Sequence, residues 1–216
     1  MTLTDPQLSA VFSHLSQARM APYLAMTGGD KRQALLFHEE NTSLSQSLYP
    51  LIQTVELAMR NAMDTCLASN KGPQIYSGQH PVWRHASQAR IRDARDKLTR
   101  TNKTLNRDAI VAELSLGFWV SALGPKYENA LWRPSLRRAF SHRPKGQERK
   151  DVLAKADTMR DLRNRIMHHE PILTRDLKKE HDEILTLADW IDPAVSVWAR
   201  SMCTFGEAYE AATSQP

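Results

Sequence analysis

Apolar side chains recur every three or four residues along most of this chain, which is the spacing that places them on one side of an α-helix. The clearest example runs over residues 44–69, where the apolar positions are Leu48, Leu51, Ile52, Val55, Met59, Ala62 and Met63. No segment of strand length alternates β-branched and polar residues in the same way, and only 8 glycines are available for the tight turns of a β-rich fold. The pattern therefore predicts an all-α protein.

Turn-forming residues divide the chain into the helices that we expect. Asp5 and Pro6 open a first helix, Gly28 and Gly29 interrupt the chain, and Asp108 is placed to cap a helix that begins at the next residue. We expect residues 1–216 to form one helical domain. Its further helices are predicted over residues 86–101, 109–123, 147–168, 174–190 and 193–212, with loops or short helices at 70–85 and 124–147.

The composition narrows the class of protein. An excess of Lys and Arg (29) over Asp and Glu (24) gives a net charge of +5, which suits a polyanionic partner. The only cysteines, Cys66 and Cys203, have no CxxC neighbour, so we expect no disulfide framework and a cytoplasmic location.

The first residues do not resemble a signal peptide, and no segment has the ~18 apolar residues that span a bilayer, so we expect no membrane contact. Glycine patterns of nucleotide-binding and hydrolase folds are missing, and we expect no cofactor.

One short segment combines the residue types that phosphodiester chemistry uses. Arg163 precedes His168 by five positions at the end of the helix predicted over residues 147–168. On a regular helix Asn164 and His168 lie ~40° apart and share a face, whereas Arg163 and His168 lie ~140° apart. Arg163 then falls within the apolar stripe, where a guanidinium needs a carboxylate partner. Glu56, which borders the apolar stripe of its own helix, is the candidate for that partner.

Three segments together resemble a known family. Residues 162–171 contain Arg-Asn-x-x-x-His-His-Glu and resemble the R-x4-H signature of HEPN ribonuclease domains, in the form found in the Abi-like (AbiD/AbiF-type abortive infection) branch. Residues 41–61 resemble the family's first long helix, and residues 114–119 its middle helix. The resemblance implies a HEPN-type helical bundle with additional helices, usually a homodimer or higher homo-oligomer in which two R-x4-H segments face one another. By this analogy the catalytic residues are Arg163, His168 and Asn164, and the supporting residues are Glu56, Arg60, Asn61, His169 and Glu170.

The family implies a metal-independent endoribonuclease that acts in phage defence or as a toxin, restrained by a protein or small-RNA antitoxin. An imidazole, with a pKa near ~6.5, can take the proton of an RNA 2′-hydroxyl and can give one to the leaving 5′-oxygen. Arg163 would stabilise the extra charge of the phosphorane. Internal attack leaves a 2′,3′-cyclic phosphate, so DNA is not a substrate.

Other interpretations of the same residues stay open. Arg163 and His168 could instead form a structural polar network, or contact phosphate in a non-catalytic RNA- or nucleotide-binding HEPN module. A purely structural interaction protein is a third interpretation. Metal binding by His168, His169 and Glu170 is disfavoured, because adjacent histidines project in different directions. A basic stretch with few acidic neighbours supplies the candidate RNA-binding residues Arg137, Arg138, Arg143 and Lys145.

Overall fold

The computed structural model describes residues 3–214, and every regular element within that range is helical, which confirms the all-α prediction. Short 3₁₀ and π turns (η) join some of the helices. The α-helices are α1 (Asp5–Leu15), α2 (Gln17–Met26), α3 (Lys31–Lys71), α4 (His85–Arg100), α5 (Arg107–Glu113), α6 (Leu116–Ala122), α7 (Arg149–Met167), α8 (Leu177–Ile191), α9 (Pro193–Met202) and α10 (Phe205–Thr213). The short turns are η1 (Pro73–Tyr76), η2 (Pro125–Tyr127), η3 (Glu128–Trp132) and η4 (Leu136–Phe140).

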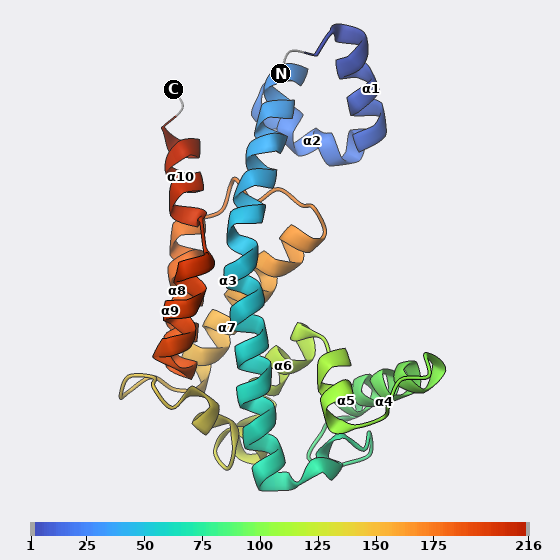
Figure 1. Cartoon of the computed structure of the whole chain (residues 1–216), viewed down its shortest axis with the longest axis vertical. Coiled ribbons are helices and arrows are strands. Elements are labelled where there is room, and N and C mark those ends of the chain that lie inside the picture. The colour runs from blue at the N-terminus through green and yellow to red at the C-terminus, as the bar shows by residue number, and fades with distance from the viewer. Residues whose placement is uncertain (1–2, 215–216) are drawn as a thin grey trace.

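Helix α3 is the axis of the molecule, and the other helices pack along its length (Figure 1). Its 41 residues extend for about 60 Å. Asp30 caps its beginning by accepting hydrogen bonds from the backbone N–H groups of Arg32 and Gln33. The sequence pattern placed the start near residue 44, which was wrong. Between Lys31 and Leu44 only Ala34 and Asn41 are buried, so this part of the helix carries little apolar periodicity.

Three other boundaries differ from those predicted. The helix expected over residues 109–123 is two helices, α5 and α6, separated by Leu114 and Ser115. Asn106 rather than Asp108 caps α5, with its side-chain oxygen 2.9 Å from the backbone nitrogen of Ala109. The segment 193–212 is likewise divided, into α9 and α10. Neither break contains a glycine or a proline, and the local signals are limited to Ser115 and Thr204, which occupy the N-cap positions of α6 and α10.

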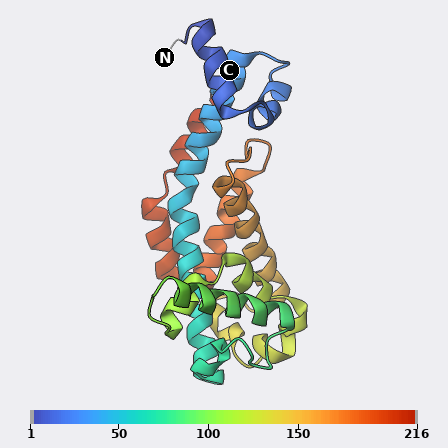
Figure 2. The same cartoon turned by 90° about the vertical axis from the view of Figure 1, so that its right-hand side faces the viewer.

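Two groups of apolar side chains hold the helices together. The larger one runs along α3 and joins it to α6, α7, α8 and α9. The smaller one, formed by Leu8, Phe12, Met20, Tyr23 and Ala34, holds α1 and α2 against the first turns of α3. Figure 2 shows this N-terminal pair at one end of the molecule and α4 crossing near the other. Within residues 3–214, no helix has both the length and the apolar character needed to cross a membrane.

Helix α7 carries the segment that the sequence singled out, and it lies beside both α3 and α8 (Figure 1). Val152, Ala156, Met159 and Leu162 are its buried side chains. Thr158 also donates a hydrogen bond of 2.9 Å to Glu183 of α8. These contacts fix the rotation of α7, and therefore which of its side chains face α3.

Candidate functional site

Arg163 of α7 faces α3 and meets Glu56 there, as expected from the helical geometry. The Nε atom of Arg163 lies 3.5 Å from the Oε2 atom of Glu56, which is an ion-pair distance but too long for a hydrogen bond. The other carboxylate oxygen accepts a hydrogen bond of 2.8 Å from Arg60, one helical turn further along α3. Arg60 in turn donates to the backbone oxygen of Ala112 in α5. One glutamate thus binds two arginines from two helices.

This Glu56 cluster, defined as Glu56, Arg60 and Arg163, is shielded but incompletely satisfied. The side chains of Glu56 and Arg60 are 14% and 13% exposed, and that of Arg163 is 34% exposed. The Nε atoms of both arginines are buried and have no hydrogen-bond acceptor among the described residues. Two guanidinium charges against one carboxylate leave a net charge of one positive unit. The terminal nitrogens of Arg163 make no hydrogen bond within the described residues, so this partly exposed guanidinium is suited to bind an anion.

The last turn of α7 closes with a Schellman motif, in which the residue after the helix adopts the left-handed conformation. His168 ends the helix, and His169 follows with φ of +56°. The backbone N–H of Glu170 donates to the oxygen of Arg165 at 2.8 Å, and that of His169 to the oxygen of Ile166 at 3.1 Å. His168, His169 and Glu170 are all exposed. The two histidines are therefore presented to solvent by the backbone of the helix end.

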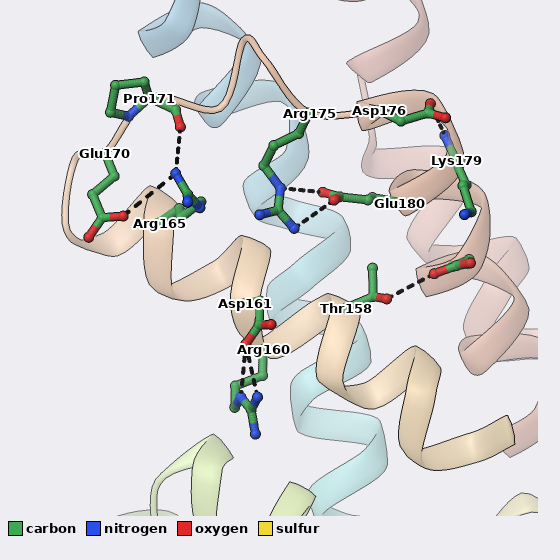
Figure 3. A network of polar contacts seen from close by, with 11 residues as sticks. Thr158, Arg160, Asp161, Arg165, Glu170, Pro171, Arg175, Asp176, Lys179 and Glu180 are labelled. Carbon is green, nitrogen blue, oxygen red and sulfur yellow. Dashed lines mark hydrogen bonds and ion pairs between the residues drawn. The ribbon is translucent and has the colours of Figure 1, made fainter. Parts of the chain in front are cut away.

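Two arginines that the sequence analysis did not single out stabilise this helix end. Arg165 donates a hydrogen bond of 3.1 Å to the backbone oxygen of Pro171, and it lies 3.8 Å from the carboxylate of Glu170 (Figure 3). Arg19 of α2 donates to the backbone oxygen of His168 at 2.7 Å. A cation at the C-terminus of a helix also complements the helix dipole. The contact of Arg19 joins residues far apart in the chain, so no local signal could have revealed it.

Two more residues near the end of α7 are fixed by the fold. The side chain of Asn41, which is 5% exposed, accepts a hydrogen bond of 2.7 Å from the backbone N–H of Ile172 and so anchors the segment after the histidines to α3. His38 packs edge-on against Tyr23, with 5.4 Å between ring centroids. Burial lowers the pKa of His38; the charge of Glu39 raises it, and that of His169 lowers it. Through these contacts, α3 is joined to α2 by His38 and to the segment after α7 by Asn41.

The remaining candidate residues lie apart from the Glu56 cluster. Asn164 and Asn61 are exposed, and among the described residues neither side chain makes a hydrogen bond. The backbone of His168 donates to the backbone oxygen of Asn164, but their side chains are not hydrogen-bonded to each other. Helix α7 is continuous from Arg149 to Met167, so no distortion of the helix turns Arg163 toward His168.

The four candidate RNA-binding residues divide into two groups. Arg137, Arg138 and Lys145 are exposed, and no salt bridge within the described range involves them. Arg143 instead lies over the ring of Trp132, and its guanidinium donates to the backbone oxygens of Arg137, Phe140 and Gln147. These contacts hold the loop between η4 and α7. The Nε and Nη1 donors of Arg143 are therefore occupied, whereas the side chains of the other three cations make no such contact among the described residues and are available.

Residues 3–214 contain no group of three or more His, Cys, Asp or Glu side chains arranged to bind a metal ion. Cys66 and Cys203 are not disulfide-bonded, and burial raises the pKa of both thiols, which disfavours the reactive thiolate. Comparisons of the chain with models of protein families, with curated proteins and with solved structures found no match. The function therefore has to be argued from the residues and their geometry.

Proposed function

We propose that the chain is a metal-independent endoribonuclease of the Abi-like HEPN type. The observation that carries this proposal is that α7 places an arginine between helices and a histidine in solvent within one short segment. The Nε of Arg163 faces Glu56 while its terminal nitrogens make no hydrogen bond to the described residues, and His168 is exposed where the helix ends. The arginine would stabilise the charge that develops on the phosphorane. His168 would move the protons of the 2′-hydroxyl and the 5′-oxygen, because an imidazole titrates near neutral pH.

The proposed active site is completed by a second copy of the chain. In a regular helix the side chains of Arg163 and His168 diverge by about 140°, so one chain does not direct both at the same phosphate. In a homodimer, Arg163 of one protomer and His168 of the other would flank one scissile bond. Asn164, His169 and Glu170 are exposed on the same helix end and would lie in this cleft. Arg137, Arg138 and Lys145 would extend the contact with the RNA backbone.

The proposed biological role is defence against phage, or action as a toxin, in the cytoplasm. A cut in host or phage RNA would stop growth, which requires restraint by a protein or small-RNA antitoxin until the enzyme is needed. This role follows from the resemblance of residues 41–61, 114–119 and 162–171 to the family, and from the proposed activity.

The activity is tested by incubating the purified protein with single-stranded RNA in EDTA and identifying the new ends. We expect 2′,3′-cyclic phosphate and 5′-hydroxyl ends, and no cut in DNA or in 2′-O-methyl RNA of the same sequence. His168→Ala and Arg163→Ala are expected to lower the rate by at least 100-fold. His85→Ala removes an exposed histidine at the start of α4 and is the matched control. Cleavage that EDTA abolishes, or that both site variants retain, would contradict the proposal.

The shared site is tested by mixing the two inactive variants. A heterodimer of Arg163→Ala with His168→Ala keeps one intact site if the arginine and the histidine come from different protomers. Random exchange then restores about a quarter of the wild-type activity, since half of the dimers are mixed and each has one working site. No recovery is expected if both groups act within one chain.

The second candidate function is a non-catalytic RNA- or nucleotide-binding module. It is favoured by the separation of Arg163, which lies between helices, from the exposed His168. Binding of RNA without the appearance of cyclic-phosphate ends would select this function.

A further inference from the structure

A small groove lies directly beside the Glu56 cluster, between α3 and α7. Its volume is about 160 Å³, and a cavity of about 150 Å³ holds a single benzene-sized ring. The groove is lined by residues of α3 that follow one side of that helix at intervals of three and four, and by two residues of α7 that are one turn apart. The lining residues are Tyr49, Ile52, Gln53, Glu56, Leu57, Arg163 and Met167.

The outer walls of the groove are apolar side chains that the fold leaves in contact with solvent. Tyr49, Leu57 and Met167 are 42%, 46% and 36% exposed. None of the aromatic pairs within residues 3–214 includes Tyr49, so its ring is free to stack on another flat group. Exposed aromatic rings beside a cationic groove are a common platform for the bases of single-stranded nucleic acid.

The inner end of the groove carries the charged side chains Glu56 and Arg163. Arg163 lines it with a guanidinium whose buried Nε faces Glu56 and whose terminal nitrogens make no hydrogen bond within residues 3–214, and Arg60 adds a second positive charge behind Glu56. The exposed amide of Gln53 supplies both a hydrogen-bond donor and an acceptor. The groove thus combines an apolar slot of one-ring size, a polar edge and an anion site. A nucleotide carries the complementary groups in the same order, since its base is flat and its phosphate is anionic.

We propose that this groove is a nucleobase subsite for single-stranded RNA. The base stacks on Tyr49 between Leu57 and Met167, its edge meets Gln53, and the adjoining phosphate lies at Arg163. The inference deepens the proposed function and rests on it, because it assigns base recognition to the site whose arginine is proposed to act on the backbone. Tyr49 and Gln53 would then influence which nucleotide lies next to the cut.

The test measures binding separately from cleavage, in the His168→Ala background. The probe is a set of short single-stranded RNAs in which 2-aminopurine replaces one base at a time. We expect its fluorescence to be quenched at one position, and Tyr49→Ala to abolish this quenching and weaken binding by roughly 10- to 100-fold. Tyr49→Phe keeps the ring and is expected to retain both. Trp198→Ala removes another exposed aromatic side chain, 60% exposed on α9, and is expected to change neither.

Each outcome has a defined meaning. If the quenching depends on Tyr49 and the wild-type chain does not cleave RNA, the result would support the subsite and contradict the proposed activity. Cleavage by the wild-type chain with no effect of Tyr49→Ala on RNA binding would overturn the subsite and leave the activity standing. The mass of each variant in solution is measured as well. If Tyr49→Ala converts a dimer to a monomer and restoring the dimer by concentration restores binding, the groove is a contact between copies and the proposal is wrong.

Discussion

Helix α3 carries two shielded carboxylates that bind arginine, and the two differ in how completely their partners are satisfied. Asp64 accepts hydrogen bonds of 3.0 and 2.5 Å from Nε and Nη2 of Arg107, and one of 2.8 Å from the hydroxyl of Tyr76. Glu56, two turns earlier, is shared between Arg60 and Arg163, and both Nε atoms lack an acceptor. The first cluster is closed and balanced in charge, whereas the second is open and positive.

This difference separates residues that stabilise the fold from residues available for a ligand. The carboxylate of Asp64 accepts two hydrogen bonds from Arg107 and one from Tyr76. The donors of Arg107 that face this site are therefore already used, and an added anion would gain no hydrogen bond from them. Buried donors without acceptors cost stability, and the Glu56 cluster has two of them. The left-handed His169, just after the helix that carries Arg163, is a second feature that costs stability. We therefore expect substitutions at Asp64 to act on folding and substitutions around Glu56 to act on RNA.

The largest effect is expected for Asp64→Ala. The change removes a carboxylate that is 9% exposed and leaves the buried hydroxyl of Tyr76 without its acceptor. We expect the free energy of unfolding to fall by roughly 2 to 3 kcal/mol, below the range for fully buried pairs, because Arg107 is 35% exposed and keeps contact with water. Urea denaturation measures the loss. At a low temperature where the variant is folded, its affinity for RNA should equal that of the wild type. A large drop in affinity would contradict the assignment of Asp64 to folding alone.

Alkaline pH should also act on the Asp64 cluster, through Tyr76. Burial, together with the charge and hydrogen bond of Asp64, raises the pKa of Tyr76. The unfolded chain loses this proton near pH ~10 while the folded chain keeps it, so stability is fully present below that pH and falls above it. The contribution of Tyr76 to the slope is about 1.4 kcal/mol per pH unit. Denaturation at a series of pH values should show a shallower decline in Tyr76→Phe, and an unchanged slope in that variant would contradict the assignment.

A smaller loss of stability is expected for Glu56→Gln. Arg60 keeps its bond to the oxygen of Ala112, and Arg163 is partly solvated, so the free energy of unfolding should fall by only about 1 kcal/mol. Removing the one negative charge should tighten RNA binding in the His168→Ala background, most strongly at low salt. Denaturation and RNA titration at two salt concentrations measure the two effects. A loss of stability equal to that of Asp64→Ala would erase the distinction between the clusters.

The sequence was sufficient where a feature depends on helical geometry within one segment. The rotation of Arg163 into the apolar stripe, and hence its need for a carboxylate, followed from spacing alone, and the contact with Glu56 is confirmed. Contacts that depend on how distant segments pack were not predictable, such as Arg19 on the oxygen of His168 or Arg107 on Asp64. The break between α5 and α6 was missed for a different reason. Its residues, Leu114 and Ser115, interrupt the helix without interrupting the apolar pattern.

The smallest effect expected here, and the one that most sharpens the contrast, is a gain in stability for His169→Gly. A left-handed residue after a helix favours glycine, so the free energy of unfolding should rise by about 0.5 to 1 kcal/mol. Asn102, at φ of +54° just after α4, offers a matched control. Asn102→Gly should gain less, because asparagine tolerates this conformation better, and it should leave RNA cleavage unchanged. His169→Gly should slow cleavage while stabilising the fold. If instead it leaves cleavage at the wild-type rate, the strain at this helix end serves no purpose in the proposed site.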